Sequence, residues 1–473
     1  MKFDRRTRIG ILSSLLIGLL AVIGYQHRCE ILSCRWTYDG PQVTQGPNVL
    51  FIAVDDLRPF LGAYGHEVAQ TPNIDAFAQS GTLFENAFVS IAICAPSRAA
   101  LMTGLRPETT GIYRLDQPVD EAAPGVGTIG EAFHGAGYTT ARIGKIYHHP
   151  ADRDFAWDYS LDSRNAVPTS GDLVEVFEDE NVLNDRMNLE KAKGLLRKMD
   201  GPFFMAVGFR KPHLSFMVPK QDWDAYEGIA IPPSINPTGQ RGAPPWALRQ
   251  MEIHRYNNVD ERQPFLAPDQ AEEARRGYLA ATTWIDRLIG ELLDELERQG
   301  LAENTIVVLW GDHGFKLGDH GYWAKHSNVD LDIRIPLIVR APGVTPAGSR
   351  ADGIVETVDI FPTLAELTGV GMPEELDGAS FVSLLRRPSG EGKMAAFAQY
   401  PRYAGQTDGH GPLMGDTVRT RDYRYTAWID EDGSIVAREL YDLRKDSVEA
   451  TNLAGQHAYA DAEMRLEKIR RSR

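Results

Sequence analysis

Residues Asn48-Val49-Leu50-Phe51-Ile52-Ala53-Val54 form a continuous apolar run that is followed by the carboxylates Asp55 and Asp56. A strand that is apolar throughout, without alternation, is typical of the centre of a sheet that helices cover on both faces. Similar runs recur between helical patterns, at residues 139–143, 203–209, 305–310 and 336–340. The sequence therefore predicts a doubly wound α/β fold.

A second apolar run also ends in residues that can bind a metal. Residues 305–310 lead into Gly311-Asp312-His313-Gly314. In open α/β sheets, ligands bind outside the carboxyl ends of the strands. The pairs Asp55-Asp56 and Asp312-His313 are therefore expected at one crevice. Three carboxylates in one pocket repel one another unless a cation lies between them. Either pair alone would often be a turn or cap, but together they predict a metal site.

The segment Ala92-Ile93-Cys94-Ala95-Pro96-Ser97-Arg98 opens a helix rich in Ala, Leu and Met. Pro96 suits the first helical position. Cys94 is then expected at or just before the helix N-terminus, where unpaired amides favour an anion. Arg98, one turn on, is expected to share its face. A lone cysteine is more often a small buried hydrophobe, so on these residues alone both interpretations stay open.

Other candidates for chemistry also follow strand ends. Transfer of a sulfuryl or phosphoryl group needs a divalent ion and fixed cations against the oxygens. The candidate cations are Arg98, Lys145 and Lys325, and the candidates for proton transfer are His148, His149, His213 and His320. An isolated Lys or His is more often a surface or capping residue, so their position beside the strand ends is what favours a catalytic role.

Composition excludes several classes of protein. The 473 residues carry a net charge of −15, which argues against a nucleic-acid partner because no basic surplus is available to neutralise phosphates. An acidic protein can still bind an anion in a local cationic pocket. The three cysteines, Cys29, Cys34 and Cys94, rule out a disulfide framework.

Residues 1–28 resemble an export segment. Four basic residues precede an apolar run at 9–25. Either a cleaved signal peptide or a signal anchor fits, so membrane anchoring through residues 9–25 stays open. The positive flank predicts a cytoplasmic N-terminus and export of the rest. The chain has no permitted Asn-x-Ser/Thr sequon, which favours a bacterial periplasmic, cell-surface or extracellular protein.

The rest of the chain divides into a linker, 29–47, a catalytic domain, 48–384, and a C-terminal subdomain, 385–473. Residues 151–185 and 216–265 lack a clear period and are predicted to be loops, the second group forming the rim of a cleft. In the C-terminal part, alternating segments at 417–428 and 434–441 and a helix at 457–469 predict a small antiparallel sheet closed by a helix.

The pattern Cys94-x-Pro96-Ser97-Arg98 resembles the signature of the formylglycine-dependent (type I) sulfatase family. Trp323-Ala324-Lys325 and Lys211-Pro212-His213 resemble its iduronate-2-sulfatase branch. Further matching stretches lie at 54–58, 71–75, 101–104, 144–148, 311–321, 326–328, 358–364, 399–402 and 439–442. The resemblance implies an alkaline-phosphatase/sulfatase-like fold, with a large mixed central sheet flanked by helices and a small C-terminal antiparallel sheet plus helix.

The resemblance also implies cofactors. Cys94 is expected to be oxidised by a separate maturation enzyme to formylglycine (3-oxoalanine), whose hydrate is the nucleophile. Calcium, ahead of magnesium or manganese, is expected to be bound by the modified side chain 94 together with Asp55, Asp56, Asp312 and His313. A nitrogen ligand is unusual for calcium, which prefers oxygens.

Roles for the other residues come from the same resemblance. Arg98 and Lys145 are expected to hold the sulfate and the hydrated aldehyde. His148 is expected to take a proton as sulfate is released, and His213 and Lys325 to protonate the leaving sugar oxygen. The implied substrate is a sulfated carbohydrate, with a 2-O-sulfated uronic acid or related sugar as the first choice. Phe315 departs from the tryptophan of the iduronate enzyme, which leaves the sugar open.

Two other functions remain on the sequence alone. The first is a phosphomonoester or phosphodiester hydrolase of the same superfamily, although such enzymes normally use Ser or Thr as the nucleophile. The second is a non-catalytic, sulfatase-like binding protein in which Cys94 is never converted.

Overall fold

The computed structural model describes residues 35–473 except 165–166, 168, 249–251, 261 and 263–264. The predicted export segment 1–28, its apolar run 9–25, and the two cysteines Cys29 and Cys34 lie outside the described residues, as does the start of the linker. Within the described part of the chain, no helix has the length and apolar character that crossing a membrane requires.

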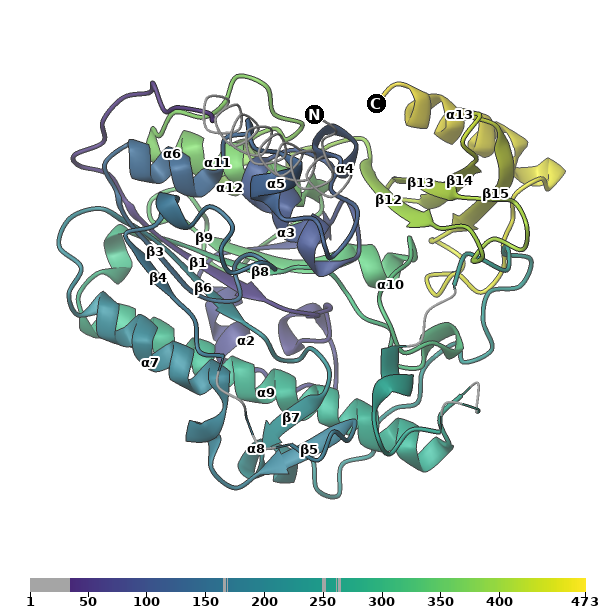
Figure 1. Ribbon diagram of the computed structural model, residues 1–473, viewed down its shortest axis with the longest axis horizontal. Coiled ribbons are helices and arrows are strands. Elements are labelled where there is room, and N and C mark those ends of the chain that lie inside the picture. The colour runs from purple at the N-terminus through teal and green to yellow at the C-terminus, as the bar shows by residue number, and fades with distance from the viewer. Residues whose placement is uncertain (1–34, 165–166, 168, 249–251, 261, 263–264) are drawn as a thin grey trace, which may run out of the picture.

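A nine-stranded mixed sheet forms the centre of the molecule (Figure 1). Its main path runs in the order β10 (Ser349–Ala351), β2 (Thr82–Phe88), β9 (Arg334–Arg340), β8 (Thr305–Gly311), β1 (Asn48–Val54), β6 (Phe203–Phe209), β3 (Thr139–Gly144) and β4 (Tyr159–Leu161), and β11 (Val355–Glu356) pairs with β2. β1 is parallel to both neighbours, whereas β9 is antiparallel to β2 and β8. The expected mixed sheet is confirmed.

Helices cover both faces of this sheet (Figure 1). One face carries α3 (Cys94–Thr103), α6 (Ile129–Gly135), α11 (Ile360–Thr368) and α12 (Val382–Arg386). The other carries α2 (Pro72–Gln79), α7 (Asn184–Leu196) and α9 (Pro268–Arg298). Each face buries its own apolar cluster. All seven residues of β1 are buried, which explains its uninterrupted apolar sequence.

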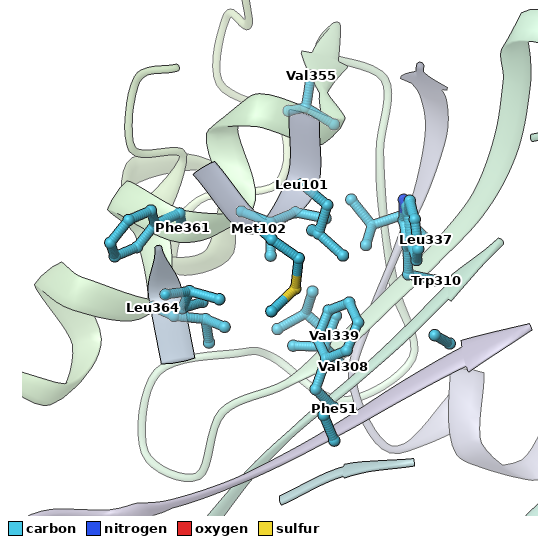
Figure 2. Close-up of a cluster of buried hydrophobic side chains, with 14 of the residues drawn as sticks. Phe51, Leu101, Met102, Val308, Trp310, Leu337, Val339, Val355, Phe361 and Leu364 are labelled. Atoms are coloured by element: carbon cyan, nitrogen blue, oxygen red, sulfur yellow. The ribbon is translucent and has the colours of Figure 1, made fainter. Parts of the chain in front are cut away.

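Helix α3 is anchored on the sheet by its apolar residues. Figure 2 shows Leu101 and Met102 packed among side chains of β8, β9 and α11, including Val308, Val339 and Leu364. All ten residues of α3 are buried. Because the helix cannot shift against this core without opening a cavity, its N-terminal end is held in place.

Several elements differ from the sequence-based expectation. α3 begins at Cys94, so Pro96 stands third rather than first in the helix; the third position also needs no intrahelical N–H, so proline fits there. The segments predicted as loops contain β5 (Val174–Phe177), a parallel partner of β7 (Phe216–Pro219), and α8 (Lys220–Asp224). Elements this short show no readable period.

The C-terminal sheet has four antiparallel strands, β12 (Ala396–Arg402), β13 (Leu413–Arg419), β14 (Tyr423–Ile429) and β15 (Ile435–Asp442). α13 (Ala460–Arg471) packs on it, as expected. The alternating segment 417–428 in fact spans the end of β13, a turn and most of β14. The domain boundary near residue 385 stays a prediction.

The remaining elements are short. The helices are α4 (Pro107–Thr110), α5 (Val119–Ala122) and α10 (Asp330–Ile333). The single 3₁₀ turns are η1 (Gly62–Tyr64), η2 (Asp154–Ala156), η3 (Glu180–Val182), η4 (Glu252–Arg255), η5 (Ala302–Asn304), η6 (Asp319–Gly321), η7 (Thr357–Asp359) and η8 (His457–Tyr459).

Candidate active site

Four neighbouring parallel strands deliver candidate residues to one edge of the sheet. β8, β1, β6 and β3 lie side by side in the same direction. They are followed, in that order, by Asp312-His313, Asp55-Asp56, the segment 210–213 that contains His213, and Lys145. The site therefore lies at the carboxyl ends of the strands, where open α/β sheets bind ligands.

The acidic residues and Cys94 meet in a buried cluster. Asp55, Cys94, Asp312 and His313 each offer a ligand atom, and these atoms all lie within 4.8 Å of one another. A second group with the same spacing joins Asp56 and His213 to Asp55 and Cys94. The backbone N–H of Asp56 donates to Asp312 Oδ1 at 2.9 Å, so the two strand ends are also bonded directly.

The turn after β1 has an unusual conformation. Asp56 has a φ of 59°, in the left-handed region that few residues other than glycine and short polar side chains adopt. The Tyr278 hydroxyl of α9 donates to the Asp56 carbonyl at 2.8 Å and accepts from the Arg58 N–H at 3.0 Å. Such strain persists where surrounding contacts hold it, and here it accompanies a carboxylate in the cluster.

Cys94 lies at the first position of α3 and is 2% exposed. Its Sγ is 3.2 Å from His313 Nε2. Burial and the nearby Asp55 charge both oppose ionisation of the thiol, but Lys145, Lys325 and His313 outweigh them, so the pKa of Cys94 is well below its ordinary value. This position stabilises negative charge.

Three buried cations bind the carboxylates of the cluster. Arg98 donates from Nε to Asp312 Oδ2 at 2.8 Å and from Nη2 to Asp55 Oδ1 at 3.3 Å. Lys145 Nζ is 2.5 Å from Asp55 Oδ2. Lys325 Nζ lies 2.9 and 3.0 Å from the two oxygens of Asp56. All three cations predicted from the sequence thus lie at the cluster.

The donor set fits a divalent metal ion. Burial opposes ionisation of Asp55, yet Lys145, His213 and Arg98 keep its pKa well below the ordinary value. Burial and the Asp55 charge raise the pKa of Asp312 to about 7. The protein's own cations therefore leave one carboxyl of the cluster incompletely compensated, which a divalent ion among three carboxylates would correct.

The candidate histidines divide into two sets. His213 belongs to the cluster. Its Nδ1–H donates to the Leu214 carbonyl at 2.6 Å, so in the neutral ring Nε2 is the nitrogen that can accept a proton or bind a ligand. His148 is half-buried beside His149, with 5.2 Å between ring centroids, and its buried Nδ1 has no hydrogen-bond partner among the described residues. His149 contacts the Leu115 carbonyl and His320 contacts Asn236, and neither belongs to the ligand groups found in the described part of the chain.

Sequence reasoning missed two buried residues beside the cluster, Glu252 and His326. Glu252 Oε2 lies 3.4 Å from Lys325 Nζ, and Oε1 contacts His326 Nε2. Glu252 comes from the segment 216–265, where no period marks any residue for function. His326 directly follows Lys325, a proximity that could have drawn attention to it.

A cavity of about 720 Å³ opens next to the cluster. Ile93, the neighbour of Cys94, lines it together with Glu252 and His326. Its outer wall is polar and aromatic, with Tyr113, Arg114, His254, Arg255, Tyr400 and Tyr403. The lining also includes the carboxylate of Asp116, so the cavity is mixed in charge, and its aromatic and hydrogen-bonding side chains suit a polar ligand.

Comparison with known proteins agrees with this arrangement. Residues 47–370 match the family described as Sulfatase, and residues 318–472 match N-sulphoglucosamine sulphohydrolase, C-terminal. The chain is 33% identical to human iduronate 2-sulfatase, over 87% of this chain and 91% of the relative. It is 32% identical to the mouse enzyme, over 88% and 92%, and 30% identical to a sulfatase of Formosa agariphila, over 91% and 87%.

Two solved structures share the fold. The phosphonate monoester hydrolase of Agrobacterium radiobacter has a TM-score of 0.78 at 24% identity, covering 90% of this chain and 95% of that one. A protein solved with its substrate D-glucosamine-2-N,6-O-disulfate has a TM-score of 0.77 at 24% identity, covering 90% and 97%. The expected alkaline-phosphatase/sulfatase-like fold is confirmed. Since the sulfatase family matches residues 47–370 and iduronate 2-sulfatases are more than 30% identical over most of the chain, the protein belongs to the type I sulfatase family of sulfuric ester hydrolases.

Proposed function

We propose that the protein hydrolyses the sulfate ester of a sulfated carbohydrate, with a 2-O-sulfated uronic acid or a related sugar as the substrate. One observation carries this proposal: Cys94 lies among metal-ligand atoms, all within 4.8 Å of one another, and the buried cations Arg98, Lys145 and Lys325 contact the same carboxylates. This is the arrangement that an anionic sulfuryl group needs. The substrate class is supported by the sugars named for the related enzymes.

Residues Asp55, Asp56, Asp312 and His313, with the side chain at 94, would hold the metal, which we propose is calcium. When bound, the ion withdraws charge from the sulfate oxygens, and a hydrated aldehyde at position 94 supplies the attacking hydroxyl. An unmodified Cys94 has no such hydroxyl, so the proposal includes conversion of Cys94 to formylglycine by a maturation enzyme.

The chain's own residues orient the ester and move protons. Arg98 and Lys145, both buried, neutralise the sulfate oxygens without having to reorganise, which is what makes fixed charges effective in catalysis. Lys325 and His213 lie on the cluster and protonate the leaving sugar oxygen as its bond to sulfur breaks. The buried Nδ1 of His148 has no hydrogen-bond partner among the described residues, and we propose that this imidazole takes the proton as sulfate is released. Overall, the ester and water give an alcohol and sulfate.

The test uses protein produced together with a formylglycine-generating enzyme and a panel of sulfated mono- and disaccharides. We expect turnover of a 2-O-sulfated uronate, none with Cys94→Ala, and an aldehyde at residue 94 by mass spectrometry. Normal activity with only a free thiol at residue 94 would contradict the mechanism. Phosphate mono- and diesters belong to the same panel, and faster turnover of these would favour the phosphoester hydrolase instead.

We also propose that the enzyme is exported to the periplasm or cell surface, either cleaved after residues 1–28 or anchored by residues 9–25. The basic flank and apolar run support this. Cell fractionation of the full chain tests it, with a chain lacking residues 9–25 as the control that should stay in the cytoplasm.

A further inference from the structure

We propose that Glu252 is a positioning residue that, together with His326 and Tyr400, orients Lys325 toward the leaving oxygen of the substrate. This inference rests on the proposed function, in which Lys325 protonates that oxygen. It assigns a role to a carboxylate that lies in a segment without any recognisable motif.

Lys325 lies between two carboxylates. Its Nζ contacts both oxygens of Asp56, at 2.9 and 3.0 Å, and on its other side is 3.4 Å from Glu252 Oε2. The side chains of Lys325 and Glu252 are only 3% and 8% exposed. Asp56 belongs to a candidate metal-ligand group, and Glu252 is in neither group found among the described residues. Glu252 is therefore the carboxylate whose charge remains committed to Lys325.

Glu252 is itself held by a chain of hydrogen bonds. Its Oε1 contacts His326 Nε2, and His326 Nδ1 is 2.7 Å from the Tyr400 hydroxyl. Burial raises the pKa of Tyr400, and it lowers the pKa of His326 although the Glu252 carboxylate opposes that shift, which favours a protonated tyrosine and a neutral imidazole. The Tyr400 O–H then donates to Nδ1, and the Nε2–H donates to Glu252. This direction leaves the negative charge of Glu252 facing Lys325.

Backbone bonds tie this chain to the reaction centre. The Glu252 N–H donates to the Trp323 carbonyl at 3.1 Å, and the His326 N–H donates to the Ala92 carbonyl at 3.2 Å. The segments that carry Glu252, Lys325 and Cys94 are thus bonded to one another. A displacement of about 1 Å at a catalytic group can cost about 100-fold in rate, so such bracing has a catalytic consequence.

The location of Glu252 fits this role. Glu252, His326 and Tyr400 all line the cavity of about 720 Å³ beside Cys94. A sugar whose sulfate lies at the cluster must extend into that cavity, so its bridging oxygen lies near the boundary where Lys325 and Glu252 meet. Other basic groups among the described residues also act on Glu252. Arg255 Nη2 lies 3.8 Å from Oε2, on a side chain that is 61% exposed and therefore a weaker partner, and the charge of His213 helps to lower the pKa of Glu252.

The leaving group distinguishes a positioning role from a structural one. A sugar alkoxide is a poor leaving group and needs a proton as the bond to sulfur breaks, whereas a nitrophenolate leaves almost unaided. General acid catalysis is worth about 10²–10⁴-fold in rate. With Glu252→Gln we therefore expect kcat to fall by about 10²-fold on the sugar sulfate and only a few-fold on an aryl sulfate such as nitrocatechol sulfate.

The experiment compares wild type, Glu252→Gln and His326→Gln, each produced as the full chain with the maturation enzyme. Glu273→Gln, an exposed glutamate of α9, is the matched control. Aldehyde content at residue 94, metal content and Tm are measured for each protein, so that rates are expressed per converted, folded molecule. His326→Gln should show the same dependence on the leaving group with a smaller loss, and it replaces Glu252→Gln if that variant fails to fold.

Two results would overturn the inference while the proposed function stands. Equal losses on the sugar and aryl sulfates would mean that Glu252 supports only the structure. A higher KM for the sugar with kcat unchanged would mean that Glu252 binds the substrate directly. A wild-type enzyme that cleaves no sulfate ester would instead overturn the proposed function, and this inference with it.

Discussion

At the residue scale, the site depends on cations and carboxylates that are buried together. Arg98 joins Asp55 and Asp312, which follow different strands, through two separate nitrogens. Its Nη1 also contacts the carbonyl of Lys145 and, at 3.2 Å, that of Ile146. A planar guanidinium presents five N–H donors in a rigid fork, whereas an ammonium has three donors on a single nitrogen. Arg98 therefore has a structural role, and the proposed function gives it a catalytic role as well.

Replacing Arg98 should affect both roles. Arg98→Ala leaves two buried carboxylates without this partner, and breaking a buried ion pair costs about 3–5 kcal/mol of the free energy of unfolding. Arg98→Lys keeps the charge but loses the fork, so we expect it to be more stable than Arg98→Ala and still at least about 100-fold slower than wild type. Denaturant unfolding and kcat/KM measure these effects.

The control is Arg421→Lys, because Arg421 forms an exposed ion pair with Asp352. A fully active Arg98→Lys would contradict the catalytic role proposed for Arg98.

At the scale of elements, packing decides where Cys94 lies. The N-terminal residue of α3 is Cys94, and the other end of the helix is buried against β8, β9 and α11 (Figure 2). α9 plays the same part on the opposite face, where its buried Glu295 is 3.0 Å from Arg197, just after α7. Packing of the two helices on opposite faces of the sheet therefore holds segments of the candidate site in place.

Met102→Ala should open a cavity under α3. Met102 is 2% exposed in the main apolar cluster, and truncations of this kind cost about 2–5 kcal/mol of the free energy of unfolding. Met464→Ala, at a side chain that is 66% exposed, should change stability by about 0.5 kcal/mol or less. Chemical denaturation of the two variants gives the comparison, and equal stabilities would mean that α3 is not anchored as described.

The Glu295 contact predicts a pH dependence of stability. Hydrogen bonds from Arg197 lower the pKa of Glu295 to about 2, from an ordinary value of 4.5. The unfolded chain takes up this proton at a higher pH than the folded chain, so the contact stabilises the fold above about pH 4.5 and is lost as the pH falls toward 2. Glu295→Gln should be less stable at neutral pH and lose less stability across that window. Urea unfolding at several pH values tests this, with the exposed Glu297→Gln as the control.

At the scale of the whole molecule, the fold gathers the residues of the candidate site at one edge of the sheet. β8, β1, β6 and β3 end together there, and α3 approaches the same edge from one face (Figure 1). A chain with a net charge of −15 thereby keeps a pocket of buried cations for an anionic substrate. An ion bound by these carboxylates would link metal binding to the stability of the whole fold.

Removal of the metal should therefore weaken the fold as well as the activity. An ion present at about 100 times its Kd stabilises the folded state by about 2.7 kcal/mol. We expect a chelator to lower Tm and abolish turnover, and calcium to restore both better than magnesium. Asp312→Asn removes one carboxylate at constant size, and its Tm should respond little to calcium. A wild-type Tm and activity that are insensitive to chelation would contradict a bound metal at this site.

Local patterns were enough to predict the apolar strand 48–54 with its two carboxylates, the Asp-His pair after residues 305–311, and the cysteine at the start of a helix. These patterns are short-range, and they are informative because ligands bind at the carboxyl ends of parallel strands. Which charges meet could be seen only in the folded chain, since Glu252 and Lys325 are 73 residues apart and contact each other through packing that leaves no periodic pattern in the sequence. For the same physical reason β12 and the short strands β5 and β7 were not predicted: their neighbours in space, more than their own residues, make them strands.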